Sequence, residues 1–339
     1  MIGADVSKKM SNMPFNPKSS NSRARLVPYW MLIVGALLAA APLVMQSYVV
    51  FQLTMVLVYA IALIGIGILT GATGQVSLGQ GAFFALGAYV TAIMMDSFGI
   101  SYVICLPAAA IITFAAGFLF GFPALRLSGT YLALATFALA AAMPQLLKLE
   151  VLEPWTGGVG GIFVTKPTAP FGLPISDDQW LYYFTLIVAG LALVLARNLL
   201  GSRSGRAMMA LRDNQIAASA LGVNTALYKT VAFGLSAGLT GLAGGLGALA
   251  VQFVSTDAYP ILLSIAIFVG MVVGGVGWLP GTLVGGAFIV FVPNVAEHVS
   301  QGFSGAVYGA LLFAIIFLMP RGARQLAEWL QSLTRRGRG

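Results

Sequence analysis

The sequence contains very few of the residues from which active sites and metal centres are usually built. It has 339 residues, yet only one cysteine, Cys105, and one histidine, His298. A disulfide within the chain is therefore excluded, and a zinc site of cysteine and histidine ligands has too few donors. The Gly-x-x-x-x-Gly-Lys-Ser/Thr pattern of a phosphate-binding loop does not occur. We therefore expect a protein that is not an enzyme, needs no metal or cofactor and cannot hydrolyse ATP alone.

Charged residues are also scarce. They make up 8% of the chain and hydrophobic residues 59%, whereas a soluble domain carries about 25% charged residues. The 41 glycines fit a membrane protein, because glycine lets membrane helices approach each other closely. The composition predicts an all-α polytopic membrane protein embedded in a lipid bilayer. We attribute the net charge of +8 to orientation in the membrane and expect no nucleic-acid partner.

Ten apolar segments predict about ten transmembrane helices. They lie near residues 29–45, 48–69, 79–95, 102–122, 130–147, 180–196, 230–253, 261–276, 281–295 and 305–319. A full span needs roughly 20 residues, so the third, eighth and ninth segments are short. Five spans followed by five would relate the halves as an inverted repeat with broken helices.

The lysines and arginines fall on one side of the membrane if there are ten spans. They precede the first segment and follow the fourth, sixth and tenth, which leaves only Lys148 and Lys166 on the other side. Because basic loops stay in the cytoplasm, we expect both termini and the loop 197–229 to be cytoplasmic. The loop 148–179 is then periplasmic.

The ends of the chain differ from the apolar part. Residues 1–27 are polar and without period, which predicts a disordered cytoplasmic arm. Residues 28–320 form the predicted transmembrane domain. The tail 321–339 carries Leu326, Trp329, Leu330 and Leu333 at helical spacing among arginines. We expect a basic amphipathic helix on the inner leaflet.

The polar loop 197–229 predicts two short helices. Ser204 or Gly205 can open the first, Asp213 and Asn214 can cap the second, and Gly222 can end it. The second helix carries small residues where surface helices usually have long side chains, and a small-residue face lets another protein approach closely. The alternative is that this basic loop only sets the topology.

The same loop resembles a known family. Asp213-Asn214-Gln215-Ile216-Ala217-Ala218, followed by Gly222-Val223-Asn224, is similar to the Glu-Ala-Ala loop of bacterial ABC importer permeases. In the branched-chain amino acid variety the loop commonly contains Arg-Asp-Asn-Glu-Ile-Ala-Ala, so Gln215 stands where glutamate is usual. The resemblance implies that residues of this loop couple the chain to an ATPase. These residues are Arg206, Arg212, Asp213, Asn214, Gln215, Ala217, Ala218 and Gly222.

Four further motifs support the resemblance. Residues 74–83 are similar to the Gly-Gln-x-Ser-Leu-Gly-x-Gly-Ala-Phe signature of branched-chain amino acid permeases, and the segments 123–136, 156–160 and 273–287 also match. They fall in the family's order, cover most of residues 50–321 and match the LivM-type member of the permease pair best. The resemblance implies a bacterial inner-membrane subunit of an ABC importer. A LivH-like second permease, two ATP-binding subunits and a periplasmic substrate-binding protein are the implied partners.

Glycines mark a predicted break in the membrane. Gly71, Gly74, Gly79 and Gly81 interrupt an apolar run, and backbone groups freed there need hydrogen-bond partners. We predict that this segment lines the route of the solute. The predicted route residues are Gln75, Ser77, Gly79, Gln80, Tyr89 and Thr136. The alternative is that these polar groups only bond neighbouring helices.

Two other sets of glycines are expected to serve helix packing alone. The first set has its members four residues apart and the second lies along one helical face. The first set is Gly277, Gly281 and Gly285, and the second is Gly234, Gly238, Gly241 and Gly245.

The predicted function is a permease subunit of an ATP-driven importer for branched-chain or related amino acids. Permeases of the same family for urea, amides or small aromatic acids have similar motifs and stay open as alternatives. An ion-coupled secondary transporter usually relies on ionisable groups within its spans, which are nearly lacking in this sequence. A membrane enzyme would need catalytic clusters that the sequence does not offer.

Overall fold

The computed structural model describes residues 29–124, 127, 129–158, 160–170 and 174–299, together with positions 309, 310, 317, 322, 323 and 325. The predicted arm 1–27 and the four apolar residues of the predicted tail lie outside this part. Contacts divide the chain into a unit ending at Val44 and a unit starting at Met45. In the first unit, α2 (Tyr29–Val44) is a 16-residue apolar helix that contains Pro42.

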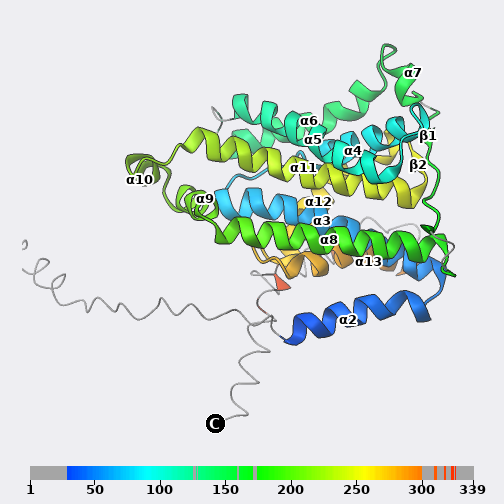
Figure 1. The fold of residues 1–339 in the computed structure, drawn as a ribbon. Coiled ribbons are helices and arrows are strands. Elements are labelled where there is room, and N and C mark those ends of the chain that lie inside the picture. The colour runs from blue at the N-terminus through cyan, green and yellow to red at the C-terminus, as the bar shows by residue number, and fades with distance from the viewer. Residues whose placement is uncertain are drawn as a thin grey trace, which may run out of the picture. The chain divides into compact units, whose positions relative to one another are not determined.

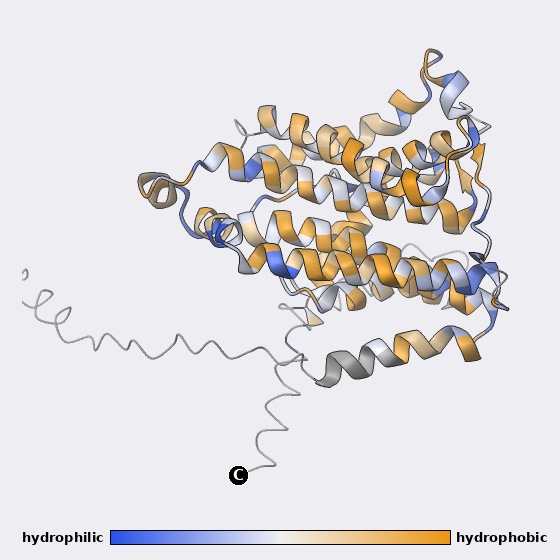
Figure 2. Ribbon diagram, in the orientation of Figure 1, coloured by the Kyte–Doolittle hydropathy of each residue, from blue (hydrophilic) through white to orange (hydrophobic). Residues whose placement is uncertain are grey.

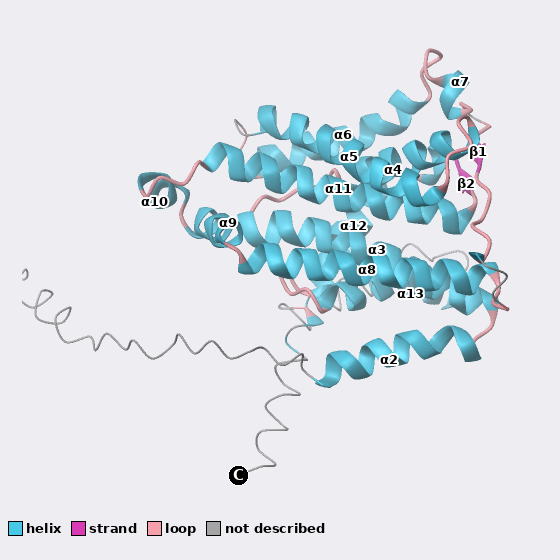
Figure 3. Ribbon diagram, in the orientation of Figure 1, coloured by secondary structure: helices cyan, strands magenta, loops and turns pink. Residues whose placement is uncertain are grey.

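The second unit is built almost wholly of helices (Figure 3). Its helices are α3 (Ser47–Ile66), the π-helical turn η1 (Gly67–Ala72), α4 (Gln80–Asp96), α5 (Tyr102–Ala124), α6 (Thr130–Leu147), α7 (Glu153–Thr156), α8 (Asp177–Gly201), α9 (Arg203–Asp213), α10 (Gln215–Ala220), α11 (Thr225–Val251), the 3-10 turn η3 (Thr256–Ala258), α12 (Ile261–Gly274) and α13 (Gly281–Val299). Two short strands, β1 (Ile162–Phe163) and β2 (Phe253–Val254), pair antiparallel, with Ile162 opposite Val254.

A helix lies at each of the first nine predicted apolar segments, whereas the tenth, 305–319, falls almost entirely outside the described residues. Within the described part, six helices are long and apolar enough to cross a membrane. They are Ser47–Ala72, Tyr102–Pro123, Thr130–Leu147, Asp177–Gly201, Thr225–Val251 and Thr256–Gly274. The fold is thus that of a polytopic helical membrane protein. The count of ten spans and the inverted repeat remain predictions.

Helix α11 forms the centre of the second unit, and α3, α4 and α5 pack around it (Figure 1). In the most apolar stretch of α11, 78% of the residues are buried inside the protein. In the corresponding stretch of α8 only 22% are buried, so α8 has a broad surface for lipid. Gly234 and Gly238 of α11 lie against Phe114 of α5, and Gly241 lies against Thr113. The predicted packing role of this glycine face is therefore confirmed.

Helices α12 and α13 also meet through glycines. The backbone of Gly274 touches Gly281, and that of Gly270 touches Gly285. Gly277 was expected on the same face, and this expectation is wrong: it lies in the turn between the helices with φ +74°. A residue with a Cβ would be strained there, so Gly277 serves the turn rather than the helical face.

The two ends of the second unit differ. One end carries α9 and α10, and the opposite end carries α7, β1 and β2 (Figure 1). At the latter end Lys148 Nζ lies 2.8 Å from Asp257 Oδ1, and Lys166 pairs with Asp178. Figure 2 shows hydrophobic residues along the long helices and hydrophilic residues gathered towards the ends. This distribution is the one that a bilayer around the middle of the unit requires.

Candidate functional site

The apolar run is broken between α3 and α4, as predicted. Helix α3 widens into the π-helical turn η1, residues 74–79 lack regular structure, and α4 begins at Gln80. Gly74 has φ +72°, which explains a glycine at this position. The Thr70 hydroxyl closes the turn by donating to the Gln75 carbonyl at 2.9 Å. We call residues 74–79 the break segment.

Near the α9 end, the amide of Gln75 fixes the break segment. Gln75 Nε2 donates to Thr73 Oγ1 at 2.8 Å and to the carbonyl of Lys229 at 3.3 Å. Ser77 is fully buried, and its hydroxyl accepts from the backbone N–H of Gly79 at 3.3 Å. Both predicted route residues therefore have partners inside the protein.

Deeper in the bundle, the break segment meets α11 at the first residue of α4. Gln80 Nε2 donates to Ser236 Oγ at 3.0 Å, and Thr240 Oγ1 donates to Gln80 Oε1 at 2.8 Å. The buried amide of Gln80 thus uses both its ends, as a polar group in a membrane interior must. Lys229 lies near the start of α11, so the break segment runs inward alongside this helix.

Helices α6 and α12 complete the surroundings of the break segment. The backbone N–H of Leu78 donates to Thr136 Oγ1, and that of Gly81 donates to Ser264 Oγ, both at 2.9 Å. Gly79 packs directly on the backbone of Thr136. The structure thus brings Gln75, Ser77, Gly79, Gln80 and Thr136 together.

Tyr89 lies further along α4 and belongs to an aromatic cluster. Its ring centroid is 6.3 Å from that of Tyr259, and Phe84 lies 6.1 Å from Tyr259. The Tyr89 hydroxyl is buried and has no hydrogen-bond partner within the described residues. Leaving a buried hydroxyl unpaired costs about 1–3 kcal/mol, so this group calls for an explanation.

Sequence reasoning missed Ser236, Thr240 and Ser264, which supply hydroxyl groups to the break segment and to the start of α4. The only signal for them was a hydroxyl inside an apolar helix. Many such hydroxyls bond the carbonyl one turn back in their own helix, as Thr91 and Thr185 do here. The three partners could therefore not be singled out without the packing.

The loop between α8 and α11 forms the two predicted helices, although the first begins earlier than expected. Ser202 caps α9, because its hydroxyl accepts from the N–H of Gly205 at 3.2 Å. The expectation that Ser204 or Gly205 opens this helix is therefore wrong. Gly205 packs on the backbone of Leu199 and Leu200, and this close approach excludes a side chain.

The second helix begins and ends as predicted. Asn214 Oδ1 accepts from the N–H of Ala217 at 3.0 Å, so Asn214 is the N-cap of α10. Asp213 is instead the last residue of α9, and it pairs with Arg212 at 3.2 Å. After α10, Gly222 has φ +84°, and the chain folds back so that Val223 N–H donates to the Ala218 carbonyl at 3.0 Å.

Exposure along α10 differs from the expected small-residue face. Ala218 is only 2% exposed and lies inside the loop, so a partner cannot meet it directly. Its small size serves the fold of the loop itself. Ile216 and Leu221, in contrast, are 82% and 84% exposed. Both aliphatic side chains are thus left bare at the α10 end of the unit.

Two predicted coupling residues turn inward, toward the rest of the bundle. Arg212 Nη1 donates to the carbonyl of Gly71 in η1 at 2.7 Å. Gln215 Oε1 accepts from Lys229 Nζ at 2.7 Å. Arg206 instead stays within the loop, where it donates to the Gly201 carbonyl at 3.1 Å.

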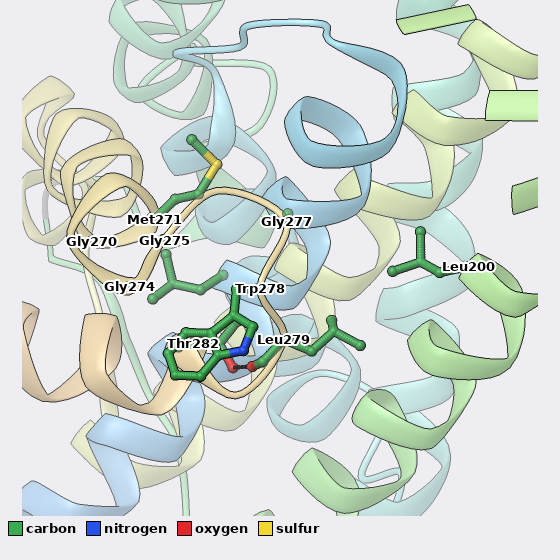
Figure 4. A pocket seen from close by; sticks show the side chains of 12 residues that line it. Leu200, Gly270, Met271, Gly274, Gly275, Gly277, Trp278, Leu279 and Thr282 are labelled. Carbon is green, nitrogen blue, oxygen red and sulfur yellow. Dashed lines mark hydrogen bonds between the residues drawn. The ribbon is translucent and has the colours of Figure 1, made fainter. Parts of the chain in front are cut away.

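An open apolar hollow lies beside η1 (Figure 4). It is formed by α3 and η1, the end of α8, and the turn between α12 and α13. Its lining residues are Leu63, Gly67, Leu200, Gly270, Met271, Gly274, Gly275, Gly277, Trp278, Leu279, Gly281 and Thr282. The hollow therefore borders the π-helical turn at the α9 end of the unit.

The described residues contain no group of three or more side chains that could hold a metal ion. The features present are apolar helices of membrane length, a buried break and a polar loop hydrogen-bonded to that break. Together they define the class as a polytopic membrane protein with a discontinuous helix, an arrangement typical of transporters.

Comparison with known proteins narrows this class. The family described as "Branched-chain amino acid transport system / permease component" matches residues 48–318, which include both the break segment and the α9–α10 loop. The chain therefore belongs to this family of permeases. The resemblance found in the motifs is confirmed.

Three relatives illustrate the similarity. The high-affinity branched-chain amino acid transport system permease protein LivM of Salmonella typhimurium is 32% identical over 79% of this chain and 68% of its own length. LivM of Escherichia coli is 31% identical over 86% of this chain and 74% of its own. LivH of Salmonella typhimurium is 26% identical over 78% of this chain and 90% of its own. The chain thus resembles LivM more than this LivH.

Proposed function

We propose that the chain is the transmembrane permease subunit of an ATP-driven importer that passes branched-chain or related amino acids across the bacterial inner membrane. The observation that carries the proposal is the family match over residues 48–318. ATP is hydrolysed by two separate ATP-binding subunits. A LivH-like permease completes the membrane part, and a periplasmic substrate-binding protein delivers the solute.

The test is reconstitution of the chain with these partners in proteoliposomes. We expect uptake of radiolabelled leucine that requires both ATP inside the vesicle and the binding protein. Uptake of urea, an amide or benzoate in place of leucine would show that the chain belongs to a permease of the same family with that substrate instead. Leucine uptake driven by an ion gradient without ATP would overturn the proposal.

The chemistry of the break segment supports a neutral or zwitterionic solute. The predicted route residues carry no net charge, and their hydrogen-bond partners are amide, hydroxyl and backbone groups. They are Gln75, Ser77, Gly79, Gln80, Tyr89 and Thr136. A zwitterion is bound weakly by such groups and can leave again, whereas a fixed opposite charge would hold it. We therefore retain these residues as the proposed route, with the hydrogen bonds of Gln75 and Gln80 holding it together.

Tyr89→Phe separates transport from stability. The variant removes a hydroxyl that bonds nothing in the described protein, so we expect the melting temperature to stay the same or rise. If the hydroxyl meets the solute, uptake falls about 2- to 10-fold, the worth of one hydrogen bond. Tyr131→Phe, at an exposed position of α6, is the matched control and should change neither quantity. Normal uptake by Tyr89→Phe would remove Tyr89 from the route.

We also propose that the α9–α10 end faces the cytoplasm, because the basic residues gather there. In a Cys105→Ser background, Thr165→Cys should react with an impermeant maleimide in intact cells, and Ala220→Cys should not. Both positions are exposed, and neither caps a helix. Labelling of Ala220→Cys from outside would show that the α9–α10 end faces the periplasm, opposite to the proposal.

The proposed contact with an ATP-binding subunit is α10. Asn214 and Gly222 set its two ends, and Ile216 and Leu221 supply the exposed apolar surface. Arg206, Asp213 and Ala217, which the resemblance also assigns to this contact, are exposed too. An apolar groove on the partner would bury both aliphatic side chains.

A further inference from the structure

We propose that Arg212 and Lys229 are positioning residues, which form two hydrogen-bonded links from the α9–α10 loop to the break between α3 and α4. Through these links, movement of the loop shifts the break segment and the start of α4. The inference rests on the proposed function, because it assumes that an ATP-binding subunit moves the loop. It assigns a role to Lys229, to the carbonyl of Gly71 and to the hollow beside η1.

The first link runs from Arg212 to η1. The guanidinium of Arg212 donates to the Gly71 carbonyl at 2.7 Å, and the Arg212 Cγ lies against Gly74. A charged donor makes this bond stronger than one between neutral groups. On its other side, Gly71 touches the backbone of Gly277, because a Cβ at Gly71 would come within 2.6 Å of Gly277 Cα. The π-helical turn is thus held between the loop and the α12–α13 turn.

The second link runs from α10 through Lys229 to the break segment. Gln215, the first residue of α10, accepts from the Lys229 ammonium at 2.7 Å. The carbonyl of the same Lys229 accepts from the Gln75 amide at 3.3 Å. One residue of α11 therefore joins the loop to the break segment. A glutamate at position 215 would form an ion pair here, whereas Gln215 keeps the bond with a neutral acceptor.

Together the two links fix the break segment from its start. They hold residues 71 and 75, and five residues later Gln80 is bonded to Ser236 and Thr240 of α11. Only four residues separate Gln75 from Gln80, and two of them, Leu78 and Gly79, are held against Thr136, so this short stretch has little slack to take up a displacement. A shift imposed at Gly71 and Gln75 therefore reaches the first turn of α4, which lies beside Ser264 and beside Thr136 of the proposed route.

The hollow leaves a small open space beside η1. Gly67, the first residue of η1, lines it, and a Cβ added at Gly67 would meet nothing within 4 Å. Figure 4 shows Trp278 and Leu279 at the hollow, on the turn that touches Gly71. A core without such a space would resist the shift, because packed interiors do not deform continuously.

Arg203 provides the matched control. It is exposed at the start of α9 and carries the same charge as Arg212 in the same helix. Replacing it leaves both links to the break in place. A loss of positive charge from the loop can thus be separated from a loss of the links.

The test follows the buried Ser77 position in the complete transporter. In a Cys105→Ser, Ser77→Cys background, we measure the rate of thiol labelling by N-ethylmaleimide with and without a non-hydrolysable ATP analogue. With both links intact, we expect the analogue to change this rate at least about fivefold. In the Arg212→Met, Lys229→Met double variant the change should vanish, although the ATP-binding subunits remain bound through Ile216 and Leu221. Arg203→Met should respond as the parent does.

Uptake by the same link and control variants, made with Ser77 and Cys105 unchanged, supplies a second measurement. The double variant should lower the maximum uptake rate without changing the half-saturating leucine concentration, and Arg212→Lys should restore part of the rate. If the double variant does not fold, Gly67→Leu is the alternative variant. The backbone at Gly67 has φ −63°, which suits any residue. The leucine side chain would fill the hollow, so this variant should also abolish the labelling response.

The possible failures are distinct. If the ATP-binding subunits do not bind the parent, the proposed function itself fails. If they bind and drive uptake, but the labelling response is absent in the parent or persists in the double variant, the links do not transmit movement and this inference is overturned.

Discussion

An Ile216→Asp, Leu221→Asp double variant should lose the ATP-binding subunits, and with them all ATP-driven uptake. The two side chains are 82% and 84% exposed, so the substitutions leave the fold of the permease alone. A buried apolar anchor at an interface is worth about 2 kcal/mol or more, and a carboxylate left in an apolar groove adds a desolvation cost. Binding should weaken at least about a hundredfold, since each 1.4 kcal/mol is tenfold. Co-purification and surface plasmon resonance measure this loss.

Ala226→Asp is the control for the added charge. It is exposed in the first turn of α11, where a carboxylate suits the helix dipole, and it lies outside α10. This variant should bind the ATP-binding subunits normally. If the Ile216→Asp, Leu221→Asp variant also binds normally, α10 is not the contact with the ATP-binding subunits. The loop would then only set the topology of the chain in the membrane.

Gly87→Ala should strongly lower the stability of the protein, although it adds only one methyl group. The Cβ of an alanine at this position would overlap the carbonyl of Gly241, so α4 and α11 would have to separate. These two helices carry Gln80 and its partners Ser236 and Thr240, and their separation would also strain those bonds. We expect a loss of about 3 kcal/mol or more in the free energy of unfolding, as for a severe overpacking change. Yield and melting temperature in detergent report it.

Gly190→Ala on α8 makes the same chemical change in open surroundings. No atom lies within 4 Å of its added Cβ, and alanine favours a helix over glycine by about 0.5–1 kcal/mol. The control should therefore equal or exceed the parent in stability. Equal melting temperatures for Gly87→Ala and the parent would show that α4 and α11 tolerate a wider spacing.

The sequence predicted helices well where the bilayer sets their ends. Helix α6 covers residues 130–147, the predicted range, because apolar composition and span coincide there. Helix α8 was predicted at 180–196 but covers Asp177–Gly201. Its first turn is fixed by a capping box between Ser176 and Gln179, and its last turn continues past Arg197, where hydropathy no longer marks a helix.

Those features of the candidate site that depend on residues close together in the sequence could be predicted. The N-cap role of Asn214 and the end at Gly222 depend on residues a few positions apart, and both appear in the structure. The orientation of Ala218 depends on how the chain folds back after α10, which composition cannot tell. The bond from Arg212 to Gly71 joins residues far apart in the chain, so only the packing could show it.

The strand pair at the end opposite α10 has a consequence for biosynthesis. Ile162 pairs with Val254, so β1 is synthesised long before its only partner strand in the described chain exists. At about 5–20 residues per second, the delay is about 5 to 20 seconds. Lys148 is likewise synthesised well before Asp257, its partner in an ion pair. Throughout this interval the loop between α6 and α8 lacks the strand pair and this ion pair, which form only after α11 has been synthesised. A protease or chaperone that reaches this loop during synthesis would therefore meet it without the strand pair and the ion pair of the finished protein.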